Sequence, residues 1–225
     1  MKLLFKKLLF GEGTSFRKIK FGVAKGIVMK IDPVNKVQRI VGLDEFEVLS
    51  YFKEFSKRYD SFLDIGSSDG FYSLIFRKYN QNGKIFSCEA TPSFYDEQIQ
   101  NFSRNNFTTA EGFTFIPLYV GNKDSESSIS IDTIALNNHI RKAVLKIDIE
   151  GAELTALEGA KKLLQDQPCA LIIETHSLEL EQRCVQFLTE LRYSCKIIKN
   201  SAVRNLLPET RNIEHNRWLV SERNL

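Results

Sequence analysis

The sequence predicts an α/β fold, a mostly parallel sheet with helices on both faces. From residue 61 onward, short apolar runs typical of buried strands alternate with segments of helical periodicity. A turn rich in glycine and aspartate separates the first apolar run from the helix that follows it. Strands joined by helices need crossover connections, and these favour a parallel sheet that is covered on both sides. A chain of 225 residues, 43% of them apolar, can bury one substantial core.

Each predicted element follows from a local pattern. The strands are short apolar runs, and the helices between them repeat apolar residues at helical spacing. Pro117 interrupts the third strand and indicates an irregularity or an edge. The predicted strands span residues 61–66, 83–90, 113–120, 143–149, 170–176, 195–199 and 217–222. The predicted helices between them span residues 70–79, 93–106, 152–164 and 178–193.

Residues 1–60 are expected to form a basic N-terminal extension or cap, and residues 61–225 the main domain. Two further strands are predicted over residues 26–32 and 36–42, and a helix over residues 45–58. Eight basic residues and one acid within the first 30 residues give that segment a charge of +7, although the whole chain carries only +3. Such an arm suits an anionic partner, while a solvated basic start is the plain alternative.

The first ten residues, MKLLFKKLLF, place apolar side chains on one helical arc and lysines on the other. This pattern predicts an amphipathic helix with peripheral membrane contact. No run approaches the roughly 20 apolar residues that a membrane span needs, so we expect a cytoplasmic protein. The modest net charge gives no reason to expect a nucleic-acid partner.

The turn after the first predicted strand, DIGSSDG, indicates a ligand site. Ligands of open parallel sheets bind outside the carboxyl ends of the strands, where the strand order reverses. Gly66 and Gly70 allow a tight turn and the close approach of a ligand. Asp64 and Asp69 would repel a phosphate but suit a cationic amino group. A purely structural turn is the alternative, because any strand-to-helix turn favours Gly, Ser and Asp.

Glu89 ends the second predicted strand, 25 residues after Asp64. An acid at this position can accept hydrogen bonds from both hydroxyl groups of an adenosine ribose. The turn and Glu89 together predict a cofactor that contains a nucleoside.

These motifs resemble those of a known family, the FkbM-type methyltransferases, a branch of the class I S-adenosylmethionine-dependent enzymes. The resemblance covers residues 61 to 177, and LKIDIEGAE is its most specific part. It implies a Rossmann-like sheet of seven strands, the last of them antiparallel, and methylation of hydroxyl groups on sugars or natural products. The similar segments are FLDIGSSDGFYSLIF, GKIFSCEATPSFYDEQIQNFSRNN, VLKIDIEGAELTALEGAKKLL and LIIETHS.

The resemblance also implies which residues contact S-adenosylmethionine. They lie in the turn after the first strand, at the end of the second strand and after the third. These residues are Asp64, Gly66, Ser67, Gly70, Glu89 and Asn122.

The segment LKIDIEGAE, residues 145–153, predicts where the chemistry takes place. A strand buried on both faces should be almost entirely apolar, yet Lys146, Asp148 and Glu150 alternate onto one side of this one. A helix missing from that face is the plain alternative. Asp148 is expected inside the strand, where its charge needs a partner such as Lys146, a cation or a sulfonium. Glu153 is interpreted as an acid at a helix start.

Glu174 and His176 share one side of the fifth predicted strand. Hydroxyl methylation requires removal of the alcohol proton, for which His is the usual side chain at neutral pH. The hypothesis is that His176 or Asp148 is the general base and that Glu150 orients the acceptor. A magnesium ion on Asp148, Glu150 and Glu174 is an open alternative, as is a structural role for His176. No metal ligand is predicted.

Two other functions compete with methyl transfer. An NAD(P)-dependent oxidoreductase of the short-chain type would use Tyr-x-x-x-Lys on one helix face, but Tyr119 and Lys123 span a strand end and a turn. A non-catalytic nucleoside-binding module is the second alternative. The sequence does not specify the acceptor, which we expect to be a small molecule, a glycan or a lipid-linked group, or the oligomeric state.

Overall fold

The structure is a computed structural model. The amphipathic segment predicted over residues 1–10 lies outside the described residues. In the part of the chain that is described, no helix is both long enough and apolar enough to span a membrane. The described residues are 11, 13–109, 112–201, 203, 215 and 217–223.

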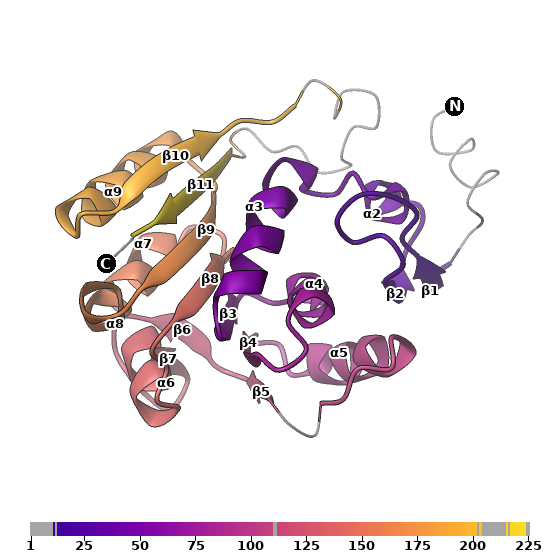
Figure 1. The fold of residues 1–225 in the computed structure, drawn as a ribbon, viewed down its shortest axis with the longest axis horizontal. Coiled ribbons are helices and arrows are strands. Elements are labelled where there is room, and N and C mark those ends of the chain that lie inside the picture. The colour runs from indigo at the N-terminus through magenta and orange to yellow at the C-terminus, as the bar shows by residue number, and fades with distance from the viewer. Residues whose placement is uncertain are drawn as a thin grey trace.

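A seven-stranded sheet forms the centre of the molecule (Figure 1). Its strand order is β10-β11-β9-β8-β3-β4-β5, and β11, the last strand in the chain, is antiparallel to both of its neighbours. The pairs from β9 to β5 are parallel. The predicted α/β class is therefore confirmed. The strands are β3 (Ser61–Ile65), β4 (Lys84–Cys88), β5 (Phe113–Ile116), β8 (Ala143–Ile147), β9 (Cys169–Thr175), β10 (Ser194–Ile198) and β11 (Arg217–Glu222).

Helices cover both faces of this sheet (Figure 1). On β8, Leu145 and Ile147 face one apolar core, whereas Val144 faces the other. The strand is buried along its whole length, so no helix is missing over its polar face. The first core contains α6 (Ile131–Asn137), α7 (Glu153–Glu158), α8 (Lys161–Asp166) and α9 (Leu178–Glu190). The second core contains α3 (Phe46–Arg58), α4 (Phe71–Tyr79) and α5 (Ser93–Arg104).

The N-terminal segment contributes to the second core. An antiparallel hairpin of β1 (Ser15–Lys18) and β2 (Val28–Ile31) precedes α2 (Val37–Val41), and β2 buries Met29 and Ile31 in the core that also holds α3. The strand predicted over residues 36–42 is wrong, because residues 37–41 form a short helix. Gly42 ends this helix in the left-handed conformation, with φ of 76°, which glycine adopts easily.

Two other predicted elements are divided in the structure. β5 ends before Pro117, and the chain continues as β6 (Tyr119–Gly121), which pairs with β7 (Ser128–Ser130) in a separate sheet. The helix predicted over residues 152–164 is interrupted at Gly159, where β6 approaches. A Cβ atom on Gly159 would lie 2.0 Å from the carbonyl oxygen of Gly121.

The strand order reverses at β3. The chain adds β4 and β5 on one side of β3, and β8 and β9 on the other. The ends of β3 and β8 are in direct contact, because the amide of Asp148 donates a hydrogen bond of 3.0 Å to the carbonyl of Ile65. The turn at Gly66 and the segment LKIDIEGAE therefore meet at the topological switch point, where ligands of such sheets bind.

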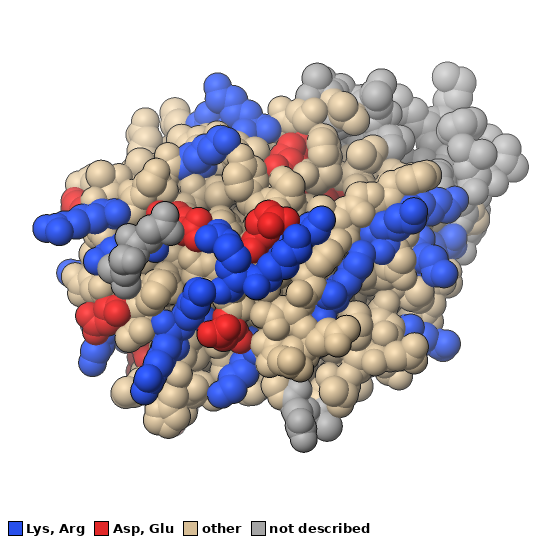
Figure 2. Space-filling model, in the orientation of Figure 1, with Lys and Arg blue, Asp and Glu red and all other residues tan. Residues whose placement is uncertain are grey.

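The surface over α3 carries charges of both signs. Figure 2 shows basic side chains spread across this face with acidic side chains among them. Such mixing is typical of a solvated protein surface.

Candidate active site

The turn that follows β3 depends on two glycines. Gly66 and Gly70 have φ angles of 77° and 78°, in the left-handed region that side chains disfavour. A Cβ atom on Gly66 would lie 2.0 Å from the carbonyl oxygen of Asp148, so only glycine lets the two segments meet. Gly70 then caps the start of α4.

The two aspartates of this turn are held by protein groups. Asp64 is buried, and its Oδ2 accepts hydrogen bonds from the backbone amide and the hydroxyl of Ser73, at 3.1 and 2.6 Å. Burial raises the pKa of Asp64 to about 7, against the opposing effect of Ser73. Asp69 contacts Lys36 Nζ at 2.6 Å and also pairs with Arg39. Burial would raise the pKa of Asp69, but the charges of Arg39 and Lys36 hold it below its usual value.

Ser67 belongs to a buried hydrogen-bond network behind the turn. Its Oγ accepts from the hydroxyl of Ser87 at 2.7 Å and from Nε2 of Gln98 at 2.9 Å. Glu89 follows β4 and is half-buried. Its two carboxylate oxygens accept the backbone amides of Ser68 and Thr91, at 3.1 and 2.9 Å. The first of these bonds ties Glu89 directly to the turn at residues 66–70.

Asn122 follows β6 and is exposed. Its amide donates a hydrogen bond of 2.9 Å to Oε2 of Glu158 on α7. The role of Asn122 and of the turn residues in cofactor binding stays a prediction.

A buried lysine lies at the centre of the charged cluster at the ends of β8 and β9. The side chain of Lys146 is only 2% exposed. Its Nζ lies 3.4 Å from Asp148, 3.7 Å from Glu174 and 3.8 Å from Glu45. The ammonium also lies 4.9 Å from the centre of the Tyr72 ring, and the Tyr72 hydroxyl donates a hydrogen bond of 2.6 Å to Glu45. We refer to Glu45, Lys146, Asp148 and Glu174 as the charged cluster.

The charged cluster shifts the pKa values of its members in different directions. Burial would lower the pKa of Lys146, but Asp148, Glu45 and Glu174 raise it, so Lys146 stays positively charged. Burial would raise the pKa of Asp148, but Lys146 and His176 hold it below its usual value. Burial, followed by repulsion from Glu45, raises the pKa of Glu174 to about 8. Glu45 shifts in the same direction through burial.

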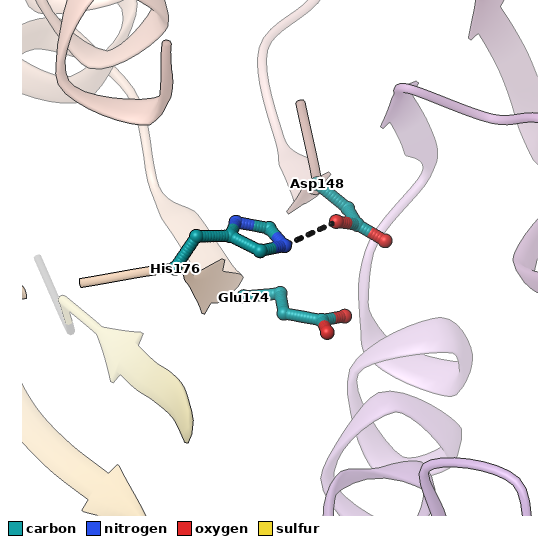
Figure 3. A group of neighbouring side chains, drawn as sticks. All are labelled: Asp148, Glu174 and His176. Atoms are coloured by element: carbon teal, nitrogen blue, oxygen red, sulfur yellow. Dashed lines mark ion pairs between the residues drawn. The ribbon is translucent and has the colours of Figure 1, made fainter. Parts of the chain in front are cut away.

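His176 lies between Asp148 and a second carboxylate, that of Glu153. Figure 3 shows Asp148, Glu174 and His176 converging from the ends of β8 and β9. His176 Nε2 lies 3.6 Å from Oδ1 of Asp148, which is too long for a hydrogen bond. His176 Nδ1 lies 2.6 Å from Oε1 of Glu153, a direct contact. The hydrogen bond with Glu153 raises the pKa of His176, against burial.

Two details of the sequence prediction need correction, and a third needs an addition. β8 ends at Ile147, so Asp148 lies just after the strand rather than inside it. Glu150 is exposed and has a φ of 38°, because the chain turns before α7 and the strand alternation no longer applies. Glu153 begins α7 as predicted, but it also contacts His176.

Sequence reasoning missed Glu45 of the charged cluster and Tyr72, which donates a hydrogen bond to it. Glu45 comes from the segment that precedes α3, and Tyr72 comes from α4. Neither belongs to a motif at a strand end, so strand periodicity could not find them. The only available signal was the polar face of β8, since a buried Lys146 with two neighbouring acids predicts further partners.

Asp148, Glu174 and His176 offer ligand atoms within 4.8 Å of one another, close enough to consider a metal ion. The positive charge of Lys146 lies 3.4 Å from Asp148 and 3.7 Å from Glu174. A divalent cation on these carboxylates would be repelled by the ammonium at short range. The arrangement therefore fits an internal ion-pair cluster better than a metal centre.

Comparison with known proteins shows that this chain is similar to methyltransferases. Residues 120–196 match the methyltransferase FkbM domain. Hexuronic acid methyltransferase AglP of Haloferax volcanii is 25% identical over 203 residues, which cover 78% of this chain and 80% of AglP.

Solved methyltransferases share the fold. The methyltransferase FkbM of Methylobacillus flagellatus superposes with a TM-score of 0.58 at 17% identity. The match covers 78% of this chain but only 53% of that protein, so this chain spans about half the length of that relative. A SAM-dependent O-methyltransferase of Thermotoga maritima superposes with a TM-score of 0.52 at 14% identity, over 78% of this chain and 64% of that protein.

Proposed function

We propose that this chain transfers the methyl group of S-adenosylmethionine to a hydroxyl group of a sugar, a glycan or a natural product, and its similarity to a methyltransferase FkbM domain and to AglP supports this proposal. The observation that carries this proposal is the position of His176. Its ring is held by Glu153 and faces an ionised Asp148, at the switch point of a Rossmann-like sheet. The name of the relative AglP supports a sugar acceptor.

The chemistry of the turn and the charged cluster fits this cofactor. Each carboxylate oxygen of Glu89 accepts one backbone amide, which leaves lone pairs free for ribose hydroxyl groups. Gly66 and Gly70 would allow close approach of the cofactor. Asp148 supplies a negative charge that suits a positively charged sulfur. When bound, S-adenosylmethionine would supply a methyl group that is activated by that charge.

His176 is the better candidate for the general base. The lowered pKa of Asp148 makes it a weak base, whereas an imidazole is the usual general base at neutral pH. Nε2 of His176 would accept the proton of the acceptor hydroxyl while the oxygen bonds to the methyl carbon. The carbon–sulfur bond would break, and the sulfur would keep the electron pair. Asp148 then stabilises the charged imidazole ring.

Two competing functions have less support. A short-chain reductase would need Tyr119 and Lys123 on one helix face, but Tyr119 lies on β6, exposed, and Lys123 follows in the turn. A non-catalytic binding module would not need a buried carboxylate that orients the histidine.

Cofactor titration and methyl transfer test the proposal. We expect calorimetry to show binding of S-adenosylmethionine and S-adenosylhomocysteine but not of NADPH. Labelled methyl groups should appear in hydroxyl-bearing glycans, with acceptors that contain hexuronic acid assayed beside neutral ones. Preference for NADPH would overturn the proposal, and cofactor binding without transfer to any acceptor would favour the binding module.

A substitution at His176 tests its role. His176→Asn should lower kcat by about 10²- to 10⁴-fold, the usual contribution of a general base. His139→Asn is the matched control, because His139 is exposed after α6 and has a φ of 54°, a conformation that Asn tolerates. Unchanged turnover of His176→Asn would exclude His176 as the base.

A further inference from the structure

Glu153 is placed differently from an ordinary acid at a helix start. Such acids favourably meet the N-terminus of the helix from an exposed position. Glu153, the first residue of α7, is instead completely buried. Its Oε2 accepts the backbone amide of Gly151 at 3.0 Å, and its Oε1 lies 2.6 Å from Nδ1 of His176. A buried carboxylate is costly unless its oxygens have partners, and here each oxygen has one.

We infer that Glu153 is the positioning residue for His176. Glu153 fixes the ring proton on Nδ1 and leaves the lone pair of Nε2 facing Asp148 and the acceptor. This inference rests on the proposed function and names the group that prepares its base. Glu153 acts through His176 and does not itself need to touch the cofactor or the acceptor.

The geometry determines which nitrogen carries the proton. A neutral imidazole has one nitrogen that donates and one that accepts. If Nδ1 carried the lone pair, that lone pair would face a carboxylate oxygen at 2.6 Å, and the two would repel each other. With the proton on Nδ1, the same contact is a strong hydrogen bond to a charged acceptor. Nε2 of His176, 3.6 Å from Asp148, is then the free acceptor.

The surrounding charges are consistent with this arrangement. The charged groups that face His176 are Glu153 on α7, Asp148 after β8 and Glu174 on β9. Glu153 is the only one of the three in direct contact with the ring among the described residues. Its hydrogen bond is the largest contribution to the raised pKa of His176.

Nitrogen NMR of the imidazole rings in the full chain tests the inference without any assay of activity. The chain contains 3 histidines, and His176→Asn assigns the signal of His176. Above its pKa, the ring of His176 in the wild-type protein should carry its proton on Nδ1. Glu153→Gln should lower the pKa of His176 by at least about one unit, because the charged acceptor is lost. A proton on Nε2 in the wild type would overturn the inference, even if the variant did not fold.

Kinetics separate positioning from a general structural role. Glu153→Gln should lower kcat by about 10- to 1000-fold, as expected when the group that orients a base is lost, with little change in the affinity for S-adenosylmethionine. The acidic limb of the pH profile of kcat should lie at lower pH in Glu153→Gln than in the wild type. The matched control is Glu190→Gln, an exposed acid at the end of α9, for which neither quantity should change. An unmoved acidic limb would overturn the inference.

The two proposals fail in different ways. If no acceptor is ever methylated but the NMR result is as expected, the proposed function fails and Glu153 still orients His176. If methyl transfer occurs and the pKa of His176 is the same in Glu153→Gln and wild type, only the inference about Glu153 fails.

Discussion

The turn after β3 and the charged cluster at the end of β8 hold their ion pairs at different distances. Asp69 in the turn contacts Lys36 at 2.6 Å, whereas Lys146 lies 3.4 Å or more from each carboxylate of the charged cluster. The two regions are in contact through Gly66 and Asp148, yet they hold their charges differently. Short, direct hydrogen bonds give the turn a fixed shape. The charged cluster instead keeps one buried cation among three acids at longer range. The turn therefore has a fixed backbone geometry, whereas the charged cluster concentrates negative charge around one buried cation.

Lys146→Met should have the largest effect on stability, because it leaves Glu45, Asp148 and Glu174 without their buried cation. Removing one partner of a buried ion pair costs about 3–5 kcal/mol. The remaining acids would bind protons to avoid their charge, so the loss in unfolding free energy should grow as pH rises. Urea unfolding of Lys146→Met and the wild type at pH 6 and pH 8 measures this loss in unfolding free energy.

Lys196→Met is the control for this variant. Lys196 lies exposed on β10, where its amine contacts the hydroxyl of Tyr51. We expect a change of about 0.5 kcal/mol or less for such a surface position. A loss below about 1 kcal/mol for Lys146→Met at pH 8 would show that Lys146 does not hold the charged cluster together.

Asp69→Asn tests whether the turn is anchored from the N-terminal segment. Without the carboxylate, Arg39 and Lys36 lose their shared partner, and unfolding free energy without cofactor should fall by about 1–3 kcal/mol. Asp60→Asn, at an exposed acid just before β3, should change it by less than about 0.5 kcal/mol. Unchanged stability together with lost binding of S-adenosylmethionine would instead favour direct contact between Asp69 and the cofactor.

Asp64→Asn should act in the opposite direction to the other two substitutions and stabilise the protein at high pH. The folded-state pKa of Asp64 is about 7, above its ordinary value of 3.8, so the folded state holds an extra proton between these pH values. Stability of the wild type therefore falls as pH rises from about 4 to 7. The Asp64→Asn variant avoids this loss. Its free energy of unfolding at pH 8 should exceed that of the wild type by about 1–4 kcal/mol. Identical pH dependence of urea unfolding in both proteins would contradict this explanation.

Much of the fold could be predicted because the patterns are local. The runs at β3, β4, β8 and β9 are short, apolar and bounded by turn residues, which specifies strands without tertiary information. The helix over residues 37–41 was mistaken for a strand, because five residues are too few to tell one period from another. Gly159 could not be recognised as a break, since only the approach of β6 explains it.

The sequence by itself determined the α/β class, the glycine turn at residues 66–70 and the concentration of charge in LKIDIEGAE. Those features depend on side-chain period and turn chemistry, which act over a few residues. Only the tertiary structure decided that Glu45 reaches Lys146, that Asp69 pairs with Lys36 and that Glu153 contacts His176. Each of these pairs joins residues more than 20 positions apart, and the packing of elements, not local periodicity, sets their distance.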